Sequence, residues 1–466
     1  MENDPDPRYK WRAMLVVSIG TFMATLDASI INLALPILRN YFNTDIATIE
    51  WVMLSYLLTI TTMLLTLGRL SDMYGRKSMF LAGLLTFTLG SGLCSLSTSA
   101  GQLIVFRVVQ GLGAAMLMAN SLAIITDVFP HNERGKALGL MGSVVSIGYI
   151  TGPVLGGLLI YWVGWQSIFY INIPVGLLGT VYAIKTLKPD QIHVSQKFDI
   201  QGALLIFLSL ISLVLVITKG QALGWDLMAI IGLSILFAVF LVGFVMVEKR
   251  ADQPMVELSL FRNRPFSASN ASAFLSFTAM FAVILLMPFY MEGILGYSPG
   301  HMGMVFVAIP LVMALVAPVS GWISDRTNSF LLSSIGMAIS CMALLLLGNL
   351  DQNATFFDIV VIMGMIGLGM GLFQSPNNSI IMGSVPKERL GIAGGMLAMV
   401  RNLGMVTGIA ISGAVLTSSI QSNQAAGLVY EAAFLGGFHD AFMVAAVICS
   451  VGVITSLMRG KSRKIT

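Results

Sequence analysis

The sequence predicts an all-α membrane protein with fourteen transmembrane helices, arranged as two six-helix bundles with two inserted helices between them. The first observation is composition: 56% of the 466 residues are hydrophobic and only 10% are charged, whereas soluble domains carry about 25% charged residues. The second is a series of apolar runs of spanning length. The third is the one-sided distribution of basic residues between those runs.

Each predicted span is an apolar run long enough to cross a hydrocarbon core about 30 Å thick. The first run follows a short polar head, Met1 to Lys10, so we expect a span there and not a cleavable signal peptide. In order, the runs are 13–35, 51–70, 79–98, 102–127, 137–160, 166–184, 200–218, 226–247, 267–292, 300–323, 330–350, 356–382, 391–418 and 436–458.

Basic residues fix the expected orientation. The termini and the connections after even-numbered spans hold 22 of the 26 Lys and Arg residues. The opposite side carries only Arg39 and Lys219, and the other two, Arg107 and Arg401, fall inside spans. Because cytoplasmic loops are enriched in Lys and Arg, we expect both termini in the cytoplasm.

Two loop motifs recur at nearly equal offsets, which indicates two related halves. Gly68–Asp72 recurs as Gly321–Asp325, 253 residues later, and Pro130–Gly135 recurs as Pro386–Gly391, 256 residues later. Parallel repeats of this kind are typical of transporters that hold substrate near the membrane midplane. The predicted domains are an N-terminal bundle (1–190), two inserted helices (191–250) and a C-terminal bundle (251–466).

A carboxylate lies in the middle of the first span. Asp27 stands within the apolar run Met14 to Leu35, where an ionised carboxylate costs at least about 2.5–3.5 kcal/mol on insertion scales. Arg107, in the fourth span, lies at a similar depth below the outer surface, so the two can form a charge pair. We predict that Asp27 exchanges protons; the alternative is a purely structural polar contact.

Two further motifs suggest conformational gating. The loop after span two combines Asp72 with Arg76 and Lys77. These charges could hold two halves together by ion pairing. Alternatively, the basic residues only reflect the enrichment of Lys and Arg in cytoplasmic loops. The fifth span places small residues on one helix face, where they permit close helix approach, with a proline that adds a bend. These residues are Gly148, Gly152, Pro153 and Gly156.

These segments resemble the major facilitator superfamily, specifically its fourteen-helix drug/proton antiporter family. The resemblance is carried by LDASIINLALP (26–36), GRLSDMYGRK (68–77), RVVQG (107–111), GYITGPVLGG (148–157), FYINIPVG (169–176) and PMVELSLFRNRPF (254–266). It implies that Asp27 is the span-one acid, that Arg107 is the span-four base, and that Gly152 and Pro153 belong to the antiporter core.

The chain also departs from the family pattern. Family members usually have Arg where this chain has Gln166, and many carry a second deep acid in the first half. The sequence shows no such acid, because Glu50 opens span two and is expected at the outer surface. Glu292 and Asp358 are likewise expected at the membrane interface.

Polar residues within spans are candidates for substrate contact. Arg401 could attract an anionic group or tie two helices together, with Gln374 as a partner of similar depth. The substrate-binding candidates are Asn32, Gln110, Gln374, Asn377 and Arg401.

The resemblance implies a proton-coupled exporter of small amphipathic or lipophilic compounds, of the kind that confers antibiotic resistance, in a bacterial cytoplasmic (inner) membrane. We expect no cofactor, because the proton gradient supplies the energy, and no GxxxxGK[ST] loop is present. We expect no metal site, no nucleic-acid partner and no catalysis, since no nucleophile–base pair or metal cluster is visible. The alternatives are a dedicated exporter of one metabolite, antibiotic or lipid and, less favoured, a membrane sensor. A periplasmic adaptor stays an open question.

Overall fold

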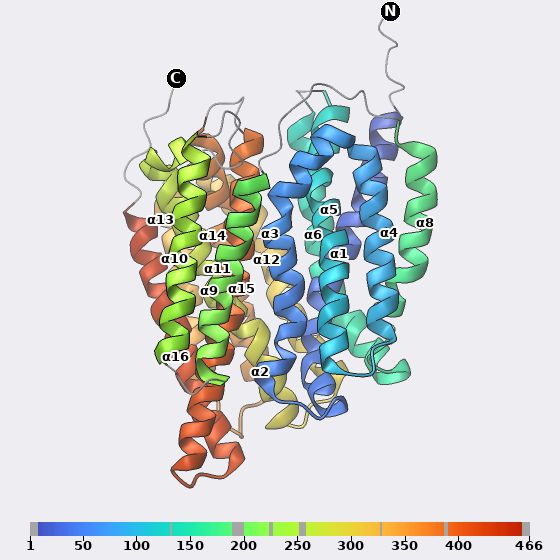
Figure 1. The fold of residues 1–466 in the computed structure, drawn as a ribbon. Coiled ribbons are helices and arrows are strands. Elements are labelled where there is room, and N and C mark those ends of the chain that lie inside the picture. The colour runs from blue at the N-terminus through green and yellow to red at the C-terminus, as the bar shows by residue number, and fades with distance from the viewer. Residues whose placement is uncertain are drawn as a thin grey trace, which may run out of the picture. The chain divides into compact units, whose positions relative to one another are not determined.

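The computed structural model describes residues 8–130, 133–188, 200–222, 227–250, 258–326, 329–385 and 390–458, which contain helices and no strand. Figure 1 shows long helices lying side by side in each part of the chain. The elements are α1 (Tyr9–Tyr41), α2 (Ile46–Ile49), α3 (Trp51–Tyr74), α4 (Arg76–Ser95), α5 (Ala100–Val128), α6 (Arg134–Val163), α7 (Ser167–Tyr170), α8 (Asn172–Thr186), α9 (Ile200–Ala222), α10 (Leu227–Arg250), η1 (Leu258–Arg262), α11 (Arg264–Gly293), α12 (Pro299–Arg326), α13 (Ser329–Gly348), α14 (Phe356–Gly383), α15 (Leu390–Ala425) and α16 (Tyr430–Leu457).

The predicted fold class is confirmed. Among the described residues, twelve helices are long and apolar enough to cross a membrane. Two shorter apolar stretches, Ile147–Val163 and Gln201–Val216, fall where the fifth and seventh spans were predicted. The main difference is length: α1 has 33 residues, about 50 Å at 1.5 Å per residue, so it extends beyond the hydrocarbon core.

The contacts divide the chain into two units. Unit 1 comprises Met1–Thr44 and Trp51–Ala203, and unit 2 comprises Asp45–Glu50 and Leu204–Thr466. In unit 1, α5 packs against α1, α3 and α4, while α1 also packs against α6 and α8. In unit 2, α11 packs against α15 and α16, and α14 packs against α12 and α13. The short helix α2 joins unit 2 through its contact with α15. The predicted domain boundaries at 190 and 250 stay predictions.

Hydroxyl side chains inside the spans bond to their own helices. Thr59, Thr61 and Thr62 of α3 donate to the carbonyl oxygens four residues earlier at 2.6–2.8 Å. A polar group without a partner is costly in hydrocarbon, and this local bond removes the cost without help from another helix. The helix can therefore carry these threonines without forming a binding site.

Candidate functional site

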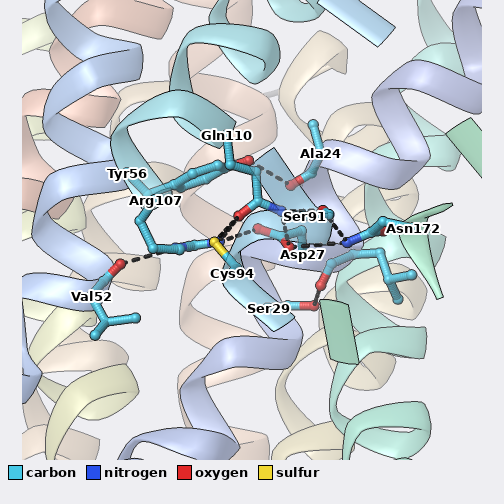
Figure 2. A network of polar contacts seen from close by, with 11 residues as sticks. Ala24, Asp27, Ser29, Val52, Tyr56, Ser91, Cys94, Arg107, Gln110 and Asn172 are labelled. Carbon is cyan, nitrogen blue, oxygen red and sulfur yellow. Dashed lines mark hydrogen bonds and ion pairs between the residues drawn. The ribbon is translucent and has the colours of Figure 1, made fainter. Parts of the chain in front are cut away.

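Asp27 lies at the centre of a buried polar network in unit 1. Its side chain is 1% exposed and accepts three hydrogen bonds. Oδ2 accepts from Arg107 Nη1 at 2.5 Å, and Oδ1 accepts from Gln110 Nε2 at 2.7 Å and from Asn172 Nδ2 at 3.2 Å. Figure 2 shows Arg107 and Asn172 approaching the carboxylate from opposite sides. Because a carboxylate accepts but does not donate when ionised, this arrangement suits the charged form.

Arg107 of α5 is fully buried, and every contact it makes suits a cation. Nε donates to the backbone oxygen of Val52 at 3.0 Å, and Nη1 donates also to Gln110 Oε1 at 2.7 Å. The guanidinium carbon lies 4.0 Å from the ring centre of Tyr56, within the range of a cation–π interaction. Arg107 therefore connects α1 to the first turn of α3.

A second layer of polar side chains holds Gln110 and Asn172 in place. Ser91 Oγ of α4 accepts from Gln110 Nε2 at 2.6 Å and from Asn172 Nδ2 at 3.2 Å. Cys94 donates from Sγ to Gln110 Oε1 at 3.8 Å. The network thus joins α1, α3, α4, α5 and α8, so any change in the charge of Asp27 acts on five helices at once.

The predicted pairing of Asp27 with Arg107 is confirmed, while its role in proton coupling stays a prediction. Asn172 and Ser91 were missed as site residues. Asn172 lies inside the stretch 169–176 and is a buried amide in an otherwise apolar run, which is the signal that could have identified it. Ser91 carries no such signal, since serines that bond only to their own helix are common in spans.

The other substrate-binding candidates lie in both units. Asn32 of α1 and Asn377 of α14 are buried, and their Oδ1 atoms have no hydrogen-bond partner among the described residues. Gln374 and Arg401 are partly exposed, and the Arg401 guanidinium lies 4.8 Å from the ring centre of Phe277. The pairing of Arg401 with Gln374 stays a prediction. The two asparagine oxygens are acceptors that a donor from substrate or water could fill.

An ion pair that was not predicted joins α4 to α5. Arg76, at the start of α4, pairs with Asp127 near the end of α5 and also donates to the Ala123 oxygen at 3.3 Å. Lys77 donates to the backbone oxygens of Ile184 and Leu187, which are C-terminal carbonyls of α8 that favour a cation. The Asp72 side chain lies outside the described residues, as do the motif residues 131–132 and 386–389, so the ion pairing between two halves stays a prediction.

The glycine row of α6 packs directly against α1. A Cβ added at Gly148 would overlap Thr25 Oγ1, and one added at Gly152 would overlap Ser29 Oγ. At Gly156 the added atom would lie 2.6 Å from Ile30 Cγ1. The predicted close helix approach is therefore confirmed, and the row lies along the stretch of α1 that contains Asp27. Pro153 lies inside α6, between two of these glycines.

Replacing Gly152 with alanine is expected to lower both transport and the Tm. The new Cβ would also lie 2.9 Å from Ser29 Cβ and 3.1 Å from the Ile30 backbone nitrogen, so α6 must move away from α1. Overpacking of this kind costs about 1–3 kcal/mol. Thermal unfolding and transport of the purified variant measure the effect. Gly232→Ala in α10 is the matched control, because no atom lies within 4 Å of its added Cβ; equal behaviour of the two variants would contradict the tight contact.

Three carboxylates, Glu50, Glu292 and Asp358, were expected at the membrane surface, and the structure corrects the expectation for one of them. Asp358 is exposed as expected and forms a capping box with Thr355 at the start of α14. Glu292 is partly exposed at the end of α11. Glu50 stands directly before α3 as expected, but its side chain is not exposed: it is buried, 2% exposed, because α2 folds against α15 and the carboxyl lies against Gly413. A buried acid at the start of α3 was not visible from its place in the sequence.

Known proteins resemble the chain over nearly its whole length. The Riboflavin transporter RibZ of Clostridioides difficile is 34% identical over 462 residues, which is 98% of this chain and 100% of that protein. The Multidrug resistance protein Stp of Mycobacterium tuberculosis is 32% identical over 406 residues, 87% of this chain and 75% of that protein. The Tetracenomycin C resistance and export protein of Streptomyces glaucescens is 29% identical, covering 88% and 76%.

A structural match and a family-model match point to the same class of protein as these relatives. A crystal structure of a bacterial homologue of the human lysosomal transporter Spinster, inward-facing and unoccupied, matches with a TM-score of 0.72 at 15% identity, covering 98% of this chain and 97% of that one. The family model described as Major Facilitator Superfamily matches residues 17–409. With its multi-pass helices and its full-length relatives, the chain belongs to the major facilitator superfamily of membrane transporters.

Proposed function

We propose that the protein is a proton-coupled antiporter that exports small amphipathic or lipophilic compounds from a bacterial cell. The single observation that carries the proposal is the buried pair of Asp27 and Arg107, together with the amides that complete it. A transport protein gains little stability from a buried ion pair, because desolvation offsets the attraction. A role in proton coupling would explain the pair, since a proton bound to Asp27 neutralises the carboxylate and removes its electrostatic attraction to Arg107.

The exchange cycle follows from the hydrogen bonds. With Asp27 ionised, Arg107, Gln110 and Asn172 all donate to it. When Asp27 takes up a proton as substrate leaves on the outer side, Arg107 loses its counter-charge, while its bond to the Val52 oxygen can persist. The first turn of α3 then stays bonded to Arg107 and can move with it, while the ion pair between Arg107 and α1 is lost. Release of the proton to the cytoplasm restores the pair and completes one turn of alternating access.

The energy available suits this role. One elementary charge moving down a 100 mV potential releases about 2.3 kcal/mol, which corresponds to a concentration ratio of roughly 50-fold. No cofactor is required. The distribution of basic residues supports insertion in the cytoplasmic membrane with both termini inside the cell.

The breadth of substrates has two candidate answers. Relatives named for multidrug or tetracenomycin resistance support export of diverse lipophilic compounds. The relative named a riboflavin transporter, which the chain matches over its full length, favours a dedicated transporter of one polar metabolite. Free acceptors on Asn32 and Asn377 are compatible with a hydrogen-bonding substrate in either case.

A compound panel in proteoliposomes distinguishes the two. Purified protein is reconstituted with an imposed proton gradient, and dissipation of the gradient is followed as riboflavin, lipophilic cations and neutral drugs are added separately. If several unrelated compounds dissipate the proton gradient, the result supports the multidrug exporter. If only riboflavin dissipates it, the result supports the dedicated transporter. Uphill transport that persists unaltered when proton gradient and voltage are both abolished would contradict proton coupling.

A further inference from the structure

Glu50 is a buried carboxyl that the proposed exchange cycle does not use. It follows the short helix α2, and its Oε2 atom has no hydrogen-bond partner among the described residues. The carboxyl lies directly over Gly413 of α15: a Cβ added there would overlap Oε2 and would lie 2.7 Å from Cδ. The carboxyl therefore fills the space that the absent side chain of Gly413 leaves open.

The described stretches of α2, α3 and α15 that lie next to Glu50 contain no cation. From Asn402 to its end at Ala425, α15 contains no Lys, Arg, His, Asp or Glu. The other ionisable group at α2 is Asp45, an exposed acid whose Oδ1 accepts from Thr48 N at 2.6 Å and caps the helix. In α3, the first charged residue after Glu50 is Arg69. An ionised Glu50 would thus be buried without a counter-ion and near a second negative charge.

A buried anion that has no counter-ion and no donor to one of its oxygens is strongly disfavoured relative to the neutral acid. The neutral carboxyl is compatible with the same packing, because it is uncharged and small enough to lie against the glycine. We propose that Glu50 is a second proton-binding site of the transporter, and that its bound proton is what allows α2 to pack against α15. Losing that proton would destabilise the packing and expose the carboxylate to water.

The two carboxyls are connected through a short stretch of backbone. Arg107, which pairs with Asp27, donates to the carbonyl oxygen of Val52, two residues after Glu50. Movement of Arg107 on protonation of Asp27 therefore pulls on the segment that begins with Glu50. This connection rests on the proposed proton exchange at Asp27, whereas the protonation of Glu50 itself does not.

Infrared spectroscopy of the reconstituted protein tests the bound proton directly. We expect a carbonyl stretching band of a neutral carboxyl at neutral pH in the wild type, and loss of that component in Glu50→Gln, which preserves size and shape. Asp45→Asn, at the neighbouring exposed acid, should leave the band unchanged. A spectrum that Glu50→Gln does not alter would overturn the proposal, since Glu50 would then be ionised.

Hydrogen–deuterium exchange tests the effect on packing and also shows whether each variant is folded. At alkaline pH we expect the peptides covering α2 and the Gly413 region to exchange several-fold faster in the wild type than in Glu50→Gln, because only the wild type can ionise there. At acidic pH the two should exchange equally. Asp45→Asn should keep the wild-type pH dependence, which excludes loss of the helix cap as its cause. Equal exchange of wild type and Glu50→Gln at alkaline pH would overturn the proposal.

Neither measurement depends on transport. A protein that shows both results but moves no protons would leave Glu50 as a proton-binding site and would refute only the antiporter cycle. A protein that exchanges substrate for protons but shows neither result would refute the Glu50 proposal alone. The two claims can therefore fail separately.

Discussion

Asp27→Asn is expected to abolish uphill export while leaving the protein folded in the membrane. The asparagine keeps the side-chain volume and can still accept from Gln110 or Asn172, but it can neither bind nor release a proton. We expect uphill accumulation driven by a proton gradient to fall to the background of protein-free vesicles. Downhill movement of substrate along its own gradient should persist, because the substrate gradient itself supplies the energy.

The measurement compares both fluxes in the same proteoliposomes. Asp45→Asn is the matched control, because it removes an exposed carboxylate outside the network and should export normally. Equal uphill export by wild type and Asp27→Asn would remove Asp27 from the mechanism. Loss of downhill flux together with uphill export would instead indicate a folding or gating defect.

Arg107→Gln is expected to destabilise the protein more than any other single change in the network. It leaves the Asp27 charge buried without its cation, and breaking a buried pair by removing one partner costs about 3–5 kcal/mol. Four direct contacts are lost at once: those to Asp27, to Gln110, to the Val52 oxygen and to the Tyr56 ring. Thermal unfolding in a fixed detergent or lipid mixture measures the loss as a lower Tm.

The double variant Asp27→Asn with Arg107→Gln is the informative comparison. Removing both charges eliminates the uncompensated anion, so we expect much of the lost Tm to return although neither wild-type charge is present. Transport should stay absent, since the proton-binding group is gone. If instead the double variant is destabilised by the sum of the two single changes, the residues do not act as a coupled pair.

The spans and the central pair could be predicted from the sequence for simple physical reasons. A membrane span must be a long apolar run, so length and composition suffice to locate it. A charge within such a run is so costly that Asp27 and Arg107 stand out, and the regular rise of a helix gives their relative depth. The Gly148–Gly156 row could be predicted because only the smallest residue lets two helices approach that closely.

The rest depends on contacts that no local pattern encodes. Glu50 looks like an interfacial acid, because its burial requires α2 to fold against α15, more than 350 residues later in the chain. Asp127 is an ordinary acid at a helix end until α4 and α5 pack and bring it to Arg76. Asn172 and Ser91 are common polar residues whose importance comes only from their proximity to Asp27 and Gln110.

The most direct test of the central claim is to count the protons that Asp27 exchanges for substrate. Vesicles containing the reconstituted protein and a trapped pH indicator are given a substrate gradient, with no pH gradient or voltage imposed. We predict proton movement opposite to the substrate in the wild type and none in Asp27→Asn, although substrate still moves in both. Counterflow of protons that continues in Asp27→Asn, or substrate movement in the wild type with no change in internal pH, would contradict the account.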